Sequence, residues 1–473
     1  MKYDTVVLGG GMSGLTCAAL QAQRNRKVAV IESAPHLSPT LHGFTRKGIY
    51  LDSGFHYVGS ASADGLLCHL LSQLGVKDAL EGNLCTPKAF DRVRILKPAF
   101  EFAFPQGWEA LEEALCEAFA ADAEKTKQYL REIKGFWEKG KAAFQVDFGR
   151  SLGIDLFTER RSVQEAIDQC TADPALATLL GCHGILYGMD ARETSLVFHS
   201  QVAGSYYESA CMVRGGGRIF VQALEAVLRE AGVDLMCGRR VVQIRSNDQG
   251  EFAAVELDTG DCLTAHQCIS TIHPKSLLEL VPSRVFSPAY RRRIRELEET
   301  PSAVVLFGRC RSADFSGNLI LLDEPRAIAH WKNLPLERRP LFISAAPTSS
   351  GAVSVICPAT LDEIPGRDGA RERPEGYQDW KRNLAERLSR HLSAHAEDLL
   401  GPVEVLDVAT PLTFRDWLGS PAGALYGVKH RLVDMPLLPR TRMQGLYLSG
   451  QTVAAPGVLG ALCSGFLTDS HMS

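Results

Sequence analysis

The sequence predicts an α/β fold that opens with a strand–helix–strand unit. Two observations support this fold class. A short apolar run at residues 4–8 leads into the glycine-rich stretch 9–14, a helical stretch at 15–20 and a second apolar run at 27–31. This order is the opening unit of a doubly wound parallel sheet. A glycine-rich pattern also returns beyond residue 406, so we expect both ends of the chain to join one sheet.

Composition excludes several classes of protein. The 473 residues are 45% hydrophobic and 22% charged, and the net charge of −4 gives no electrostatic case for nucleic acid binding. No run approaches the roughly 18 apolar residues of a membrane-spanning helix, and the chain starts before an apolar strand without a signal peptide. The thirteen cysteines form no CxxC pair and favour buried thiols in a reducing cytoplasm over disulfides or a metal site. We therefore expect a soluble cytoplasmic protein that binds no metal.

The first glycine-rich turn has the spacing that a dinucleotide pyrophosphate requires. In Gly9-x-Gly11-x-x-Gly14 the first glycine allows the turn, the second lets phosphates approach and the third lets helix and strand pack closely. Glu32 ends the second predicted strand, where its carboxylate can accept hydrogen bonds from the ribose hydroxyls of an adenosine. This turn, with its inner residues Met12 and Ser13, and Glu32 are candidate nucleotide-binding residues. The alternative is a glycine-rich turn that closes a nucleotide-free unit.

The middle of the chain follows other patterns. Residues 88–104 alternate as a hairpin would, residues 107–140 predict long helices, residues 302–358 contain several strand-like runs and residues 379–400 predict a helix. Nucleotide-type elements thus occur at the start, middle and end. We predict a discontinuous cofactor domain over residues 1–86, 213–285 and 406–473, and an inserted mixed α+β substrate domain over residues 87–212 and 286–405.

The C-terminal glycine-rich segment favours FAD over NAD. An NAD domain would continue through further βα repeats, whereas this chain leaves the sheet early and returns at Gly445–Gln451, followed by Pro456–Gly460. A helix that starts there would direct its positive end at a reduced flavin and stabilise its negative charge. The alternative is a hydrophobic C-terminal helix with a flexible start.

Several segments resemble a known superfamily. Gly9–Gly14 with Glu32, Gly48–Gly59, Thr410–Trp417, Gly423–Gly427 and the C-terminal Gly-Gln element are similar to the FAD-dependent phytoene desaturase, carotenoid isomerase and retinol saturase superfamily. Asp52–Gly59 and Gly450–Thr452 look most like its retinol saturase and carotenoid isomerase branch. The resemblance implies an amine-oxidase-like two-domain flavoprotein with a Rossmann-type FAD-binding domain. It also implies reduction, desaturation or isomerisation of a carbon–carbon double bond in an apolar polyene or isoprenoid.

The resemblance also assigns residues to the cofactor. Gly9, Gly11, Gly14 and Glu32 would hold the ADP half of FAD, and the backbone of Val241 would meet the adenine. Gly450 and Gln451 would meet the pyrophosphate and ribityl chain, and Gly457 and Val458 the flavin ring. One departure matters: Ser38-Pro39 stands where the family usually has a Gly-Gly pair, which puts that phosphate contact in doubt.

Three residues are candidates for catalysis. The loop after Asp52-x-Gly54 faces the ring in flavoproteins of this kind, which places His56 and Tyr57 over the flavin. Saturating a double bond needs a hydride on one carbon and a proton on the other, and both side chains can supply a proton. His56 could instead be a packed loop histidine. Tyr426 is a further candidate donor, with an aromatic tunnel wall as the favoured alternative.

Partners follow from what the sequence contains and lacks. We expect an apolar small-molecule substrate, and no second dinucleotide fingerprint identifies the electron donor or acceptor of the flavin. The basic cluster Arg291–Arg295 could meet anionic lipid headgroups beside the apolar segment Met435–Pro439, as a peripheral membrane contact. The acidic residues Glu296, Glu298 and Glu299 follow at once, so a solvated helix face is the favoured alternative.

Two rival functions remain at this point. A flavin amine oxidase would share the cofactor elements and should add an aromatic cage and a lysine near the flavin N5. Rab escort and GDP-dissociation-inhibitor proteins have this fold, bind prenyl lipid and carry no flavin. The Ser38-Pro39 departure favours such a flavin-free lipid-binding protein, and the intact Gly9–Gly14 turn with Glu32 favours the enzyme.

Overall fold

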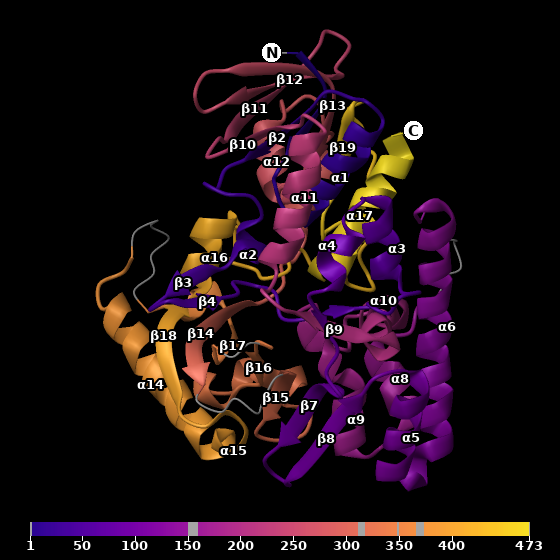
Figure 1. Cartoon of the computed structure of the whole chain (residues 1–473), viewed down its shortest axis with the longest axis vertical. Helices are drawn as coiled ribbons and strands as arrows, with labels where there is room; N and C mark the ends of the chain where they lie inside the picture. Colours follow the sequence, from indigo (N-terminus) through magenta and orange to yellow (C-terminus); the bar gives the residue numbers. More distant parts are fainter. Residues whose placement is uncertain (1, 150–158, 311–316, 348–349, 366–372, 473) are drawn as a thin grey trace.

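A computed structural model describes residues 2–149, 159–310, 317–347, 350–365 and 373–472. Two large sheets lie at opposite ends of the molecule, and the N- and C-termini lie close to the first of them (Figure 1). A group of helices from the first half of the chain stands beside the second sheet (Figure 1).

The first sheet collects strands from three distant parts of the chain, as the glycine-rich ends predict. Its strands are, in spatial order, β10 (Asp234–Cys237), β2 (Val28–Glu32), β1 (Lys2–Leu8), β13 (Cys262–Ser270), β12 (Phe252–Leu257) and β11 (Val241–Ser246), and β19 (Leu446–Leu448) pairs with the C-terminal part of β13, on the edge that β12 also uses. β10, β2, β1, β13 and β19 pair in parallel, and β12 and β11 continue antiparallel. The carboxyl ends of the parallel strands therefore meet at one edge, where α/β sheets bind ligands.

The second sheet joins the two inserted segments. Its order is β18 (Val403–Ala409), β14 (Ser302–Cys310), β17 (Ala352–Ala359), β16 (Leu341–Ala345), β15 (Gly317–Leu322), β7 (Ala89–Ile95) and β8 (Phe100–Pro105). Neighbours are antiparallel except β15 and β7, which pair in parallel across more than 200 residues of chain. The predicted hairpin at residues 88–104 is β7 and β8. The domain boundaries stay a prediction, and the one at residues 405 and 406 falls inside β18.

Helices cover both sheets and fill the space beside them. Those in the first half are α1 (Met12–Gln23), α2 (Pro39–His42), α3 (Leu66–Gln73), α4 (Lys77–Glu81), α5 (Trp108–Ala118), α6 (Ala123–Asp147), α8 (Val163–Cys170), α9 (Pro174–Gly181), η2 (Cys182–Leu186), α10 (Leu196–Glu208) and α11 (Arg218–Glu230). Those in the second half are α12 (Pro274–Leu280), α13 (Pro288–Glu296), α14 (Tyr377–His395), α15 (Glu397–Leu400), α16 (Pro411–Leu418) and α17 (Gly457–Met472). The predicted helix at residues 379–400 is thus two helices that break at Ala396.

Short strands position the loop that carries the catalytic candidates. β3 (Phe44–Arg46) and β4 (Ile49–Leu51) form a hairpin, and β5 (Val58–Gly59) joins β9 (Ala210–Val213) and β6 (Leu84–Cys85). Asp52 follows β4, and one oxygen of its carboxylate accepts a hydrogen bond from the Gly217 amide at 2.9 Å. The loop between β4 and β5 is therefore held at both ends.

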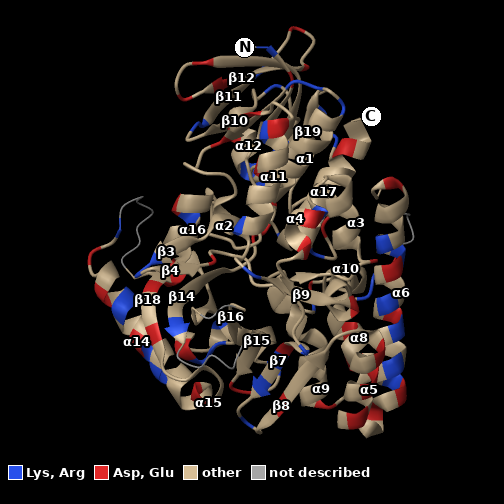
Figure 2. Ribbon diagram, in the orientation of Figure 1, with Lys and Arg blue, Asp and Glu red and all other residues tan. Residues whose placement is uncertain are grey.

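The charge distribution agrees with the composition. Basic and acidic positions both recur along α6 and α14 (Figure 2). None of the thirteen cysteines, all of which lie in the described residues, forms a disulfide, and Cys262 is exposed. In the described parts of the chain, no helix has both the length and the hydrophobicity that crossing a bilayer requires.

Candidate functional site

A cavity of about 1400 Å³, here called the central cavity, lies between the two sheets. The carboxyl ends of β1, β2 and β13 line one part, and β14, β16 and β17 line another. Its volume exceeds the roughly 300–1,000 Å³ that one drug-sized ligand occupies. The cavity is therefore large enough for two molecules side by side.

The predicted site residues converge on this cavity although they come from every part of the chain. Those that line it are Gly9, Gly11, Met12, Ser13, Glu32, Val241, Gly450, Gln451, Gly457 and Val458, together with His56, Tyr57 and Tyr426. Gly14 lies behind the lining, in the contact between α1 and the end of β1.

The three glycines of the first turn have different surroundings. Gly9 has a positive φ of 100°, and a β-carbon there would lie 2.3 Å from the Thr271 hydroxyl oxygen. A β-carbon on Gly14 would lie 2.0 Å from the Gly9 carbonyl oxygen, so only glycine allows this packing. A β-carbon on Gly11 would meet no atom within 4 Å, because it would project into the central cavity. Gly9 and Gly14 thus serve the fold, and Gly11 leaves room for a ligand.

Glu32 is fixed at the end of β2. Its side chain accepts hydrogen bonds from the backbone amides of Gly10 at 2.8 Å and Ala34 at 2.7 Å, one on each carboxylate oxygen. The oxygen bonded to Ala34 also accepts from the Ser33 hydroxyl at 3.3 Å, whereas the oxygen bonded to Gly10 keeps a further lone pair for a ligand hydroxyl. The residue is 7% exposed and reaches the cavity wall. Its carboxylate is therefore preorganised for the ribose contact that the sequence predicts.

The Ser38-Pro39 departure is accommodated by the backbone. Ser38 adopts the left-handed conformation, with φ of 46°, which glycine adopts without strain. Its amide donates to the Gly10 carbonyl oxygen at 2.9 Å, and its buried hydroxyl has no hydrogen-bond partner among the described residues. Pro39 then begins α2, where its missing amide hydrogen costs nothing. The serine thus takes the glycine conformation and leaves one polar atom unsatisfied beside the first turn.

The two ends of the chain meet at the cavity. α1 and α17 pack against each other, with Gly465 of α17 against Thr16 of α1. The N-termini of both helices line the cavity, through Gly11 and Gly457. Each N-terminus offers free amide hydrogens and a partial positive charge. The N-terminus of α1 suits a pyrophosphate, and the N-terminus of α17 suits a second anionic group. The residues present therefore fit a flavin dinucleotide.

His56 lies on the cavity wall near the ring of Phe342, with 5.4 Å between ring centroids. Burial lowers the pKa of His56 to about 4, since no carboxylate in the described structure lies close enough to stabilise its charged form. The imidazole is therefore neutral at pH 7. A neutral imidazole is a weak acid, which disfavours His56 as the proton donor.

Tyr57 has a different environment. Its ring lies in an aromatic wall with Tyr206 and Phe342, at centroid distances of 4.5 and 6.1 Å. Its hydroxyl donates to the buried carboxylate of Asp91 at 2.7 Å. Burial and the nearby Asp91 raise the pKa of Tyr57 well above its ordinary value. Tyr57 is thus a neutral phenol with a polar partner on the side away from solvent.

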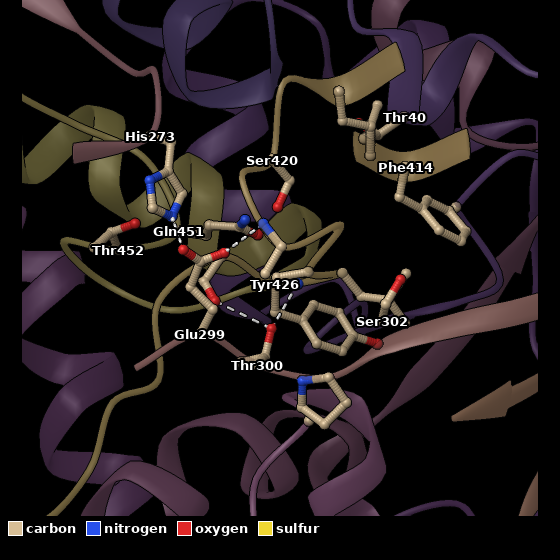
Figure 3. A pocket seen from close by; sticks show the side chains of 18 of the residues that line it. Thr40, His273, Glu299, Thr300, Ser302, Phe414, Ser420, Tyr426, Gln451 and Thr452 are labelled. Atoms are coloured by element: carbon tan, nitrogen blue, oxygen red, sulfur yellow. Dashed lines mark hydrogen bonds and ion pairs between the residues drawn. The ribbon is translucent and has the colours of Figure 1, made fainter. Parts of the chain in front are cut away.

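Tyr426 belongs to a polar group that the sequence did not predict (Figure 3). The Thr300 hydroxyl accepts from the Tyr426 amide at 3.1 Å, and burial raises the pKa of Tyr426 to about 12. Next to it, Glu299 accepts from the Lys275 ammonium at 3.0 Å and lies 3.8 Å from His273. Figure 3 shows His273 and Glu299 on one side of the cavity and Phe414 on the other. His273 and Lys275 lie at the start of α12, whereas Glu299 lies between α13 and β14, so no local motif groups all three.

Comparisons with known proteins agree with this geometry. Residues 12–355 match the model of the family described as flavin containing amine oxidoreductase. The chain is 23% identical over 530 residues to all-trans-retinol 13,14-reductase of Macaca fascicularis, covering 99% of this chain and 85% of that protein. It is 24% identical over 465 residues to 4,4'-diaponeurosporene oxygenase of Staphylococcus aureus strain Mu50, covering 90% and 88%. A crystal structure of an oxidoreductase from Methanosarcina mazei has the same fold, with a TM-score of 0.67, 16% identity, and coverage of 98% and 99%.

Proposed function

Because the chain belongs to the flavin-containing amine oxidoreductase family, we propose that it acts on a carbon–carbon double bond of an apolar polyene or isoprenoid. Membership in this family confirms the predicted amine-oxidase-like flavoprotein fold, the FAD cofactor and the oxidoreductase class. The flavin-free lipid-binding alternative is thereby set aside. When bound, the flavin supplies a centre that accepts or delivers a hydride.

Different residues of the cavity would bind different parts of the cofactor. Gly11, Met12 and Ser13 at the start of α1 would meet the pyrophosphate through backbone amides. Glu32 would accept the ribose hydroxyls. The start of α17, at Gly457 and Val458, would face the flavin ring and favour its anionic reduced form.

The observation that carries the substrate proposal is the aromatic and apolar wall of the cavity. Tyr57, Tyr206 and Phe342 pack ring to ring along one side, and Phe307 of β14 and Phe414 of α16 add further apolar surface. Such a wall suits a flat conjugated chain, because rings and polyenes stack with little polar requirement. Retinol and diaponeurosporene appear in the names of two relatives, and these names support the same substrate class.

Amine oxidation is the second candidate, because the family is named for amines and the three tyrosines of the cavity could form an aromatic cage. The lysines that line the cavity do not support amine oxidation. Lys275 is paired with Glu299, Lys429 is paired with Glu193 and Glu298, and Lys332 lies 5.7 Å from the Trp331 ring. Within the described residues, each lysine that lines the cavity is therefore already engaged by another side chain. None is available for the position beside N5 of the flavin that an amine oxidase requires.

One experiment distinguishes the two candidate functions, polyene conversion and amine oxidation. The flavin is reduced anaerobically and mixed with retinoids, carotenoid precursors or unsaturated lipids, and the oxidised flavin is mixed with amines and amino acids. We expect polyenes to reoxidise the reduced flavin, or to be isomerised by it, and amines to leave the oxidised flavin unchanged. Turnover of amines alone would overturn the polyene proposal.

We further propose that the protein meets a membrane surface to exchange its apolar substrate. Arg293 of α13 donates to the Met435 carbonyl oxygen at 2.8 Å, so the basic cluster and the apolar segment lie side by side. Val433, Met435 and Leu438 are 79%, 74% and 63% exposed. Exposed apolar side chains next to basic ones are typical of surfaces that enter the interface of an anionic bilayer.

Vesicle sedimentation tests this contact. We expect more protein to pellet with vesicles of phosphatidylserine and phosphatidylcholine than with phosphatidylcholine alone, and the double change Met435→Ser with Leu438→Ser to abolish the difference. Val146→Ser is the matched control, because Val146 is 81% exposed but lies on α6, away from the basic cluster. Equal pelleting of the control and the double variant would refute the contact.

A further inference from the structure

Asp91, which none of the predicted motifs contains, is the centre of a fully buried polar network behind the cavity wall. It lies on β7 and is 0% exposed. One carboxylate oxygen, Oδ1, accepts from the Asn318 amide at 3.0 Å. The other, Oδ2, accepts from the Tyr57 hydroxyl at 2.7 Å and is 3.0 Å from Nε2 of His183. Tyr57 and His183 therefore share a single oxygen atom of Asp91.

His183 closes the network on the far side from the cavity. It lies on η2, is 0% exposed, and its Nδ1 is 3.1 Å from the Tyr207 hydroxyl and 3.6 Å from the Cys182 sulfur. The rings of Phe90 and Phe104 pack around it. A buried carboxylate without a positive partner would be costly. An imidazolium at His183 would supply that partner through its hydrogen bond to Asp91.

We propose that Asp91 and His183 are positioning residues that store a proton behind Tyr57 and pass it through the Tyr57 hydroxyl to the substrate. The proposal rests on the proposed function in its reducing direction, since only saturation of a double bond consumes a proton. Tyr57 is the donor because its ring lines the cavity, whereas Asp91 and His183 do not line it.

The step balances without a further reactant. One carbon of the double bond would take the hydride that a reduced flavin supplies. The Tyr57 hydroxyl, once its O–H turns from Asp91 toward the cavity, would give its proton to the other carbon. The Nε2 proton of His183 moves to Oδ2 of Asp91, and the proton then held on Oδ2 moves to the phenolate oxygen of Tyr57. The phenol and the carboxylate are restored, His183 becomes neutral, and solvent replaces its proton after the product leaves.

The charges around the pair support this starting state. Burial alone lowers the pKa of His183, but Cys182 and the hydrogen bond to Asp91 act in the opposite direction, and the net pKa lies above its ordinary value. The titratable groups around Asp91 and His183 are Tyr57, Tyr129, Tyr206, Tyr207 and Cys182, and Tyr187 and His199 lie beyond Tyr207 and His183. Burial holds each of the four tyrosines neutral by raising its pKa. The imidazolium is thus the one proton store that the network offers at neutral pH.

A purely structural role is the competing explanation, and the protein contains a matched control for it. The Tyr187 hydroxyl is 2.8 Å from Nδ1 of His199, and both side chains are buried. This second tyrosine–histidine pair has no carboxylate, and neither residue lines the cavity. Burial and the charge of His183 lower the pKa of His199, but the hydrogen bond of His199 is to Tyr187 and not to a member of the relay. His199→Gln should therefore reproduce the structural cost of losing a buried histidine while the hydrogen bonds of the relay stay in place.

Single-turnover reoxidation of reduced flavin by a polyene tests the relay. We expect His183→Gln and Tyr57→Phe to slow it by about a hundredfold or more, and His199→Gln to leave it within a fewfold of wild type at equal flavin content. The wild-type rate should be independent of pH from roughly 6 to 9, and the His183→Gln rate should fall as pH rises because water must then supply the proton. A His183→Gln rate and pH profile equal to those of His199→Gln would overturn the proposal.

Nitrogen NMR of histidine-labelled protein gives a readout that needs no substrate. We expect an imidazolium signal at pH 8 that is missing in His183→Gln, and we expect Asp91→Asn to convert it to the neutral form. A neutral His183 at pH 8 in the wild type would overturn the proton store even if polyenes are turned over. If the NMR signal is as expected but no polyene reacts with wild-type protein, the proposed function fails instead.

Discussion

The hydroxyl of Ser13 lies 2.7 Å from the hydroxyl of Ser449, although 436 positions separate the two residues. The Ser449 hydroxyl is also 3.2 Å from that of Ser464, which accepts from the Gly450 amide at 2.8 Å. The first glycine-rich turn and the C-terminal one are therefore locked in a fixed relative position. A dinucleotide that contacts both turns depends on this link as well as on either motif alone.

Gly11→Val should abolish flavin retention while the protein still folds. The new side chain would project into the cavity and occupy the path of the phosphates, but it would meet no protein atom at its β-carbon. Flavin absorbance per protein and the thermal unfolding temperature of the apoprotein are the measurements. Full flavin content in this variant would place the cofactor elsewhere.

Gly14→Ala should instead destabilise the folded protein. Its β-carbon would lie 2.0 Å from the Gly9 carbonyl oxygen, so α1 must move away from β1. We expect a loss of about 1–3 kcal/mol in the free energy of unfolding, as for other overpacked sites. Gly82→Ala is the control, because nothing lies within 4 Å of that β-carbon and its φ is negative. Equal unfolding curves for the two variants would contradict the packing argument.

Glu32→Gln should weaken FAD binding about tenfold to a hundredfold. An amide keeps the size of the side chain but offers a single acceptor oxygen, so one of the two backbone amides, Gly10 or Ala34, loses its partner. Hydrogen bonds to a charged group contribute about 1.5–3 kcal/mol. The dissociation constant is obtained by flavin titration of the apoprotein. An unchanged constant would show that the adenosine does not reach Glu32.

His56→Ala should slow single-turnover reoxidation less than tenfold. The sequence favours His56 as a proton donor, but burial lowers its pKa to about 4, so at neutral pH only the weakly acidic N–H of the neutral ring remains. In the relay proposed above, Tyr57 with Asp91 behind it is the donor instead. The comparison of His56→Ala with Tyr57→Phe in the same assay decides between them. A larger loss in His56→Ala would restore the original assignment.

The stability of the apoprotein should decrease as pH falls from about 6.5 to 4. A histidine has a pKa of about 6.5 in the unfolded chain, whereas burial lowers the pKa of His56 to about 4 in the folded one. In this window the unfolded chain binds a proton that the folded chain does not, so the contribution is complete above pH 6.5 and is lost below it. His56→Gln should flatten the curve by at most about 3 kcal/mol. Parallel urea curves for both proteins across this range would disprove the assignment.

Local patterns predicted the elements that depend on neighbouring residues. The turn Gly9–Gly14, the hairpin of β7 and β8 and the long helix α6 all follow from spacing and periodicity that a few residues contain. The break between α14 and α15 could not be predicted, because Ala396 is a good helix former that leaves the helix with φ of −141°. Its burial in the core beside β14–β17 outweighs its propensity.

Asp91 shows why part of the site escaped prediction. Strict alternation along β7 would place Phe90 and Asp91 on opposite faces, yet both are buried. The pairing of β7 with β8 shifts register between Ala89 and Asp91, and this bulge gives the strand an extra inward residue. His183 and Asn318, which meet Asp91, come from other parts of the chain. Only the folded pairing of β7 with β15 brings Asn318 opposite Asp91.

The distance along the chain between α1 and α17 also bears on how the protein folds during synthesis. α1 leaves the ribosome more than 400 residues before α17, which packs against it. Until α17 emerges, part of the apolar surface of α1 lacks its partner and one of the two helix N-termini at the central cavity is missing. Contacts between such distant segments close slowly, so we expect chaperone binding to the early segments and the supply of FAD to affect the yield of active enzyme.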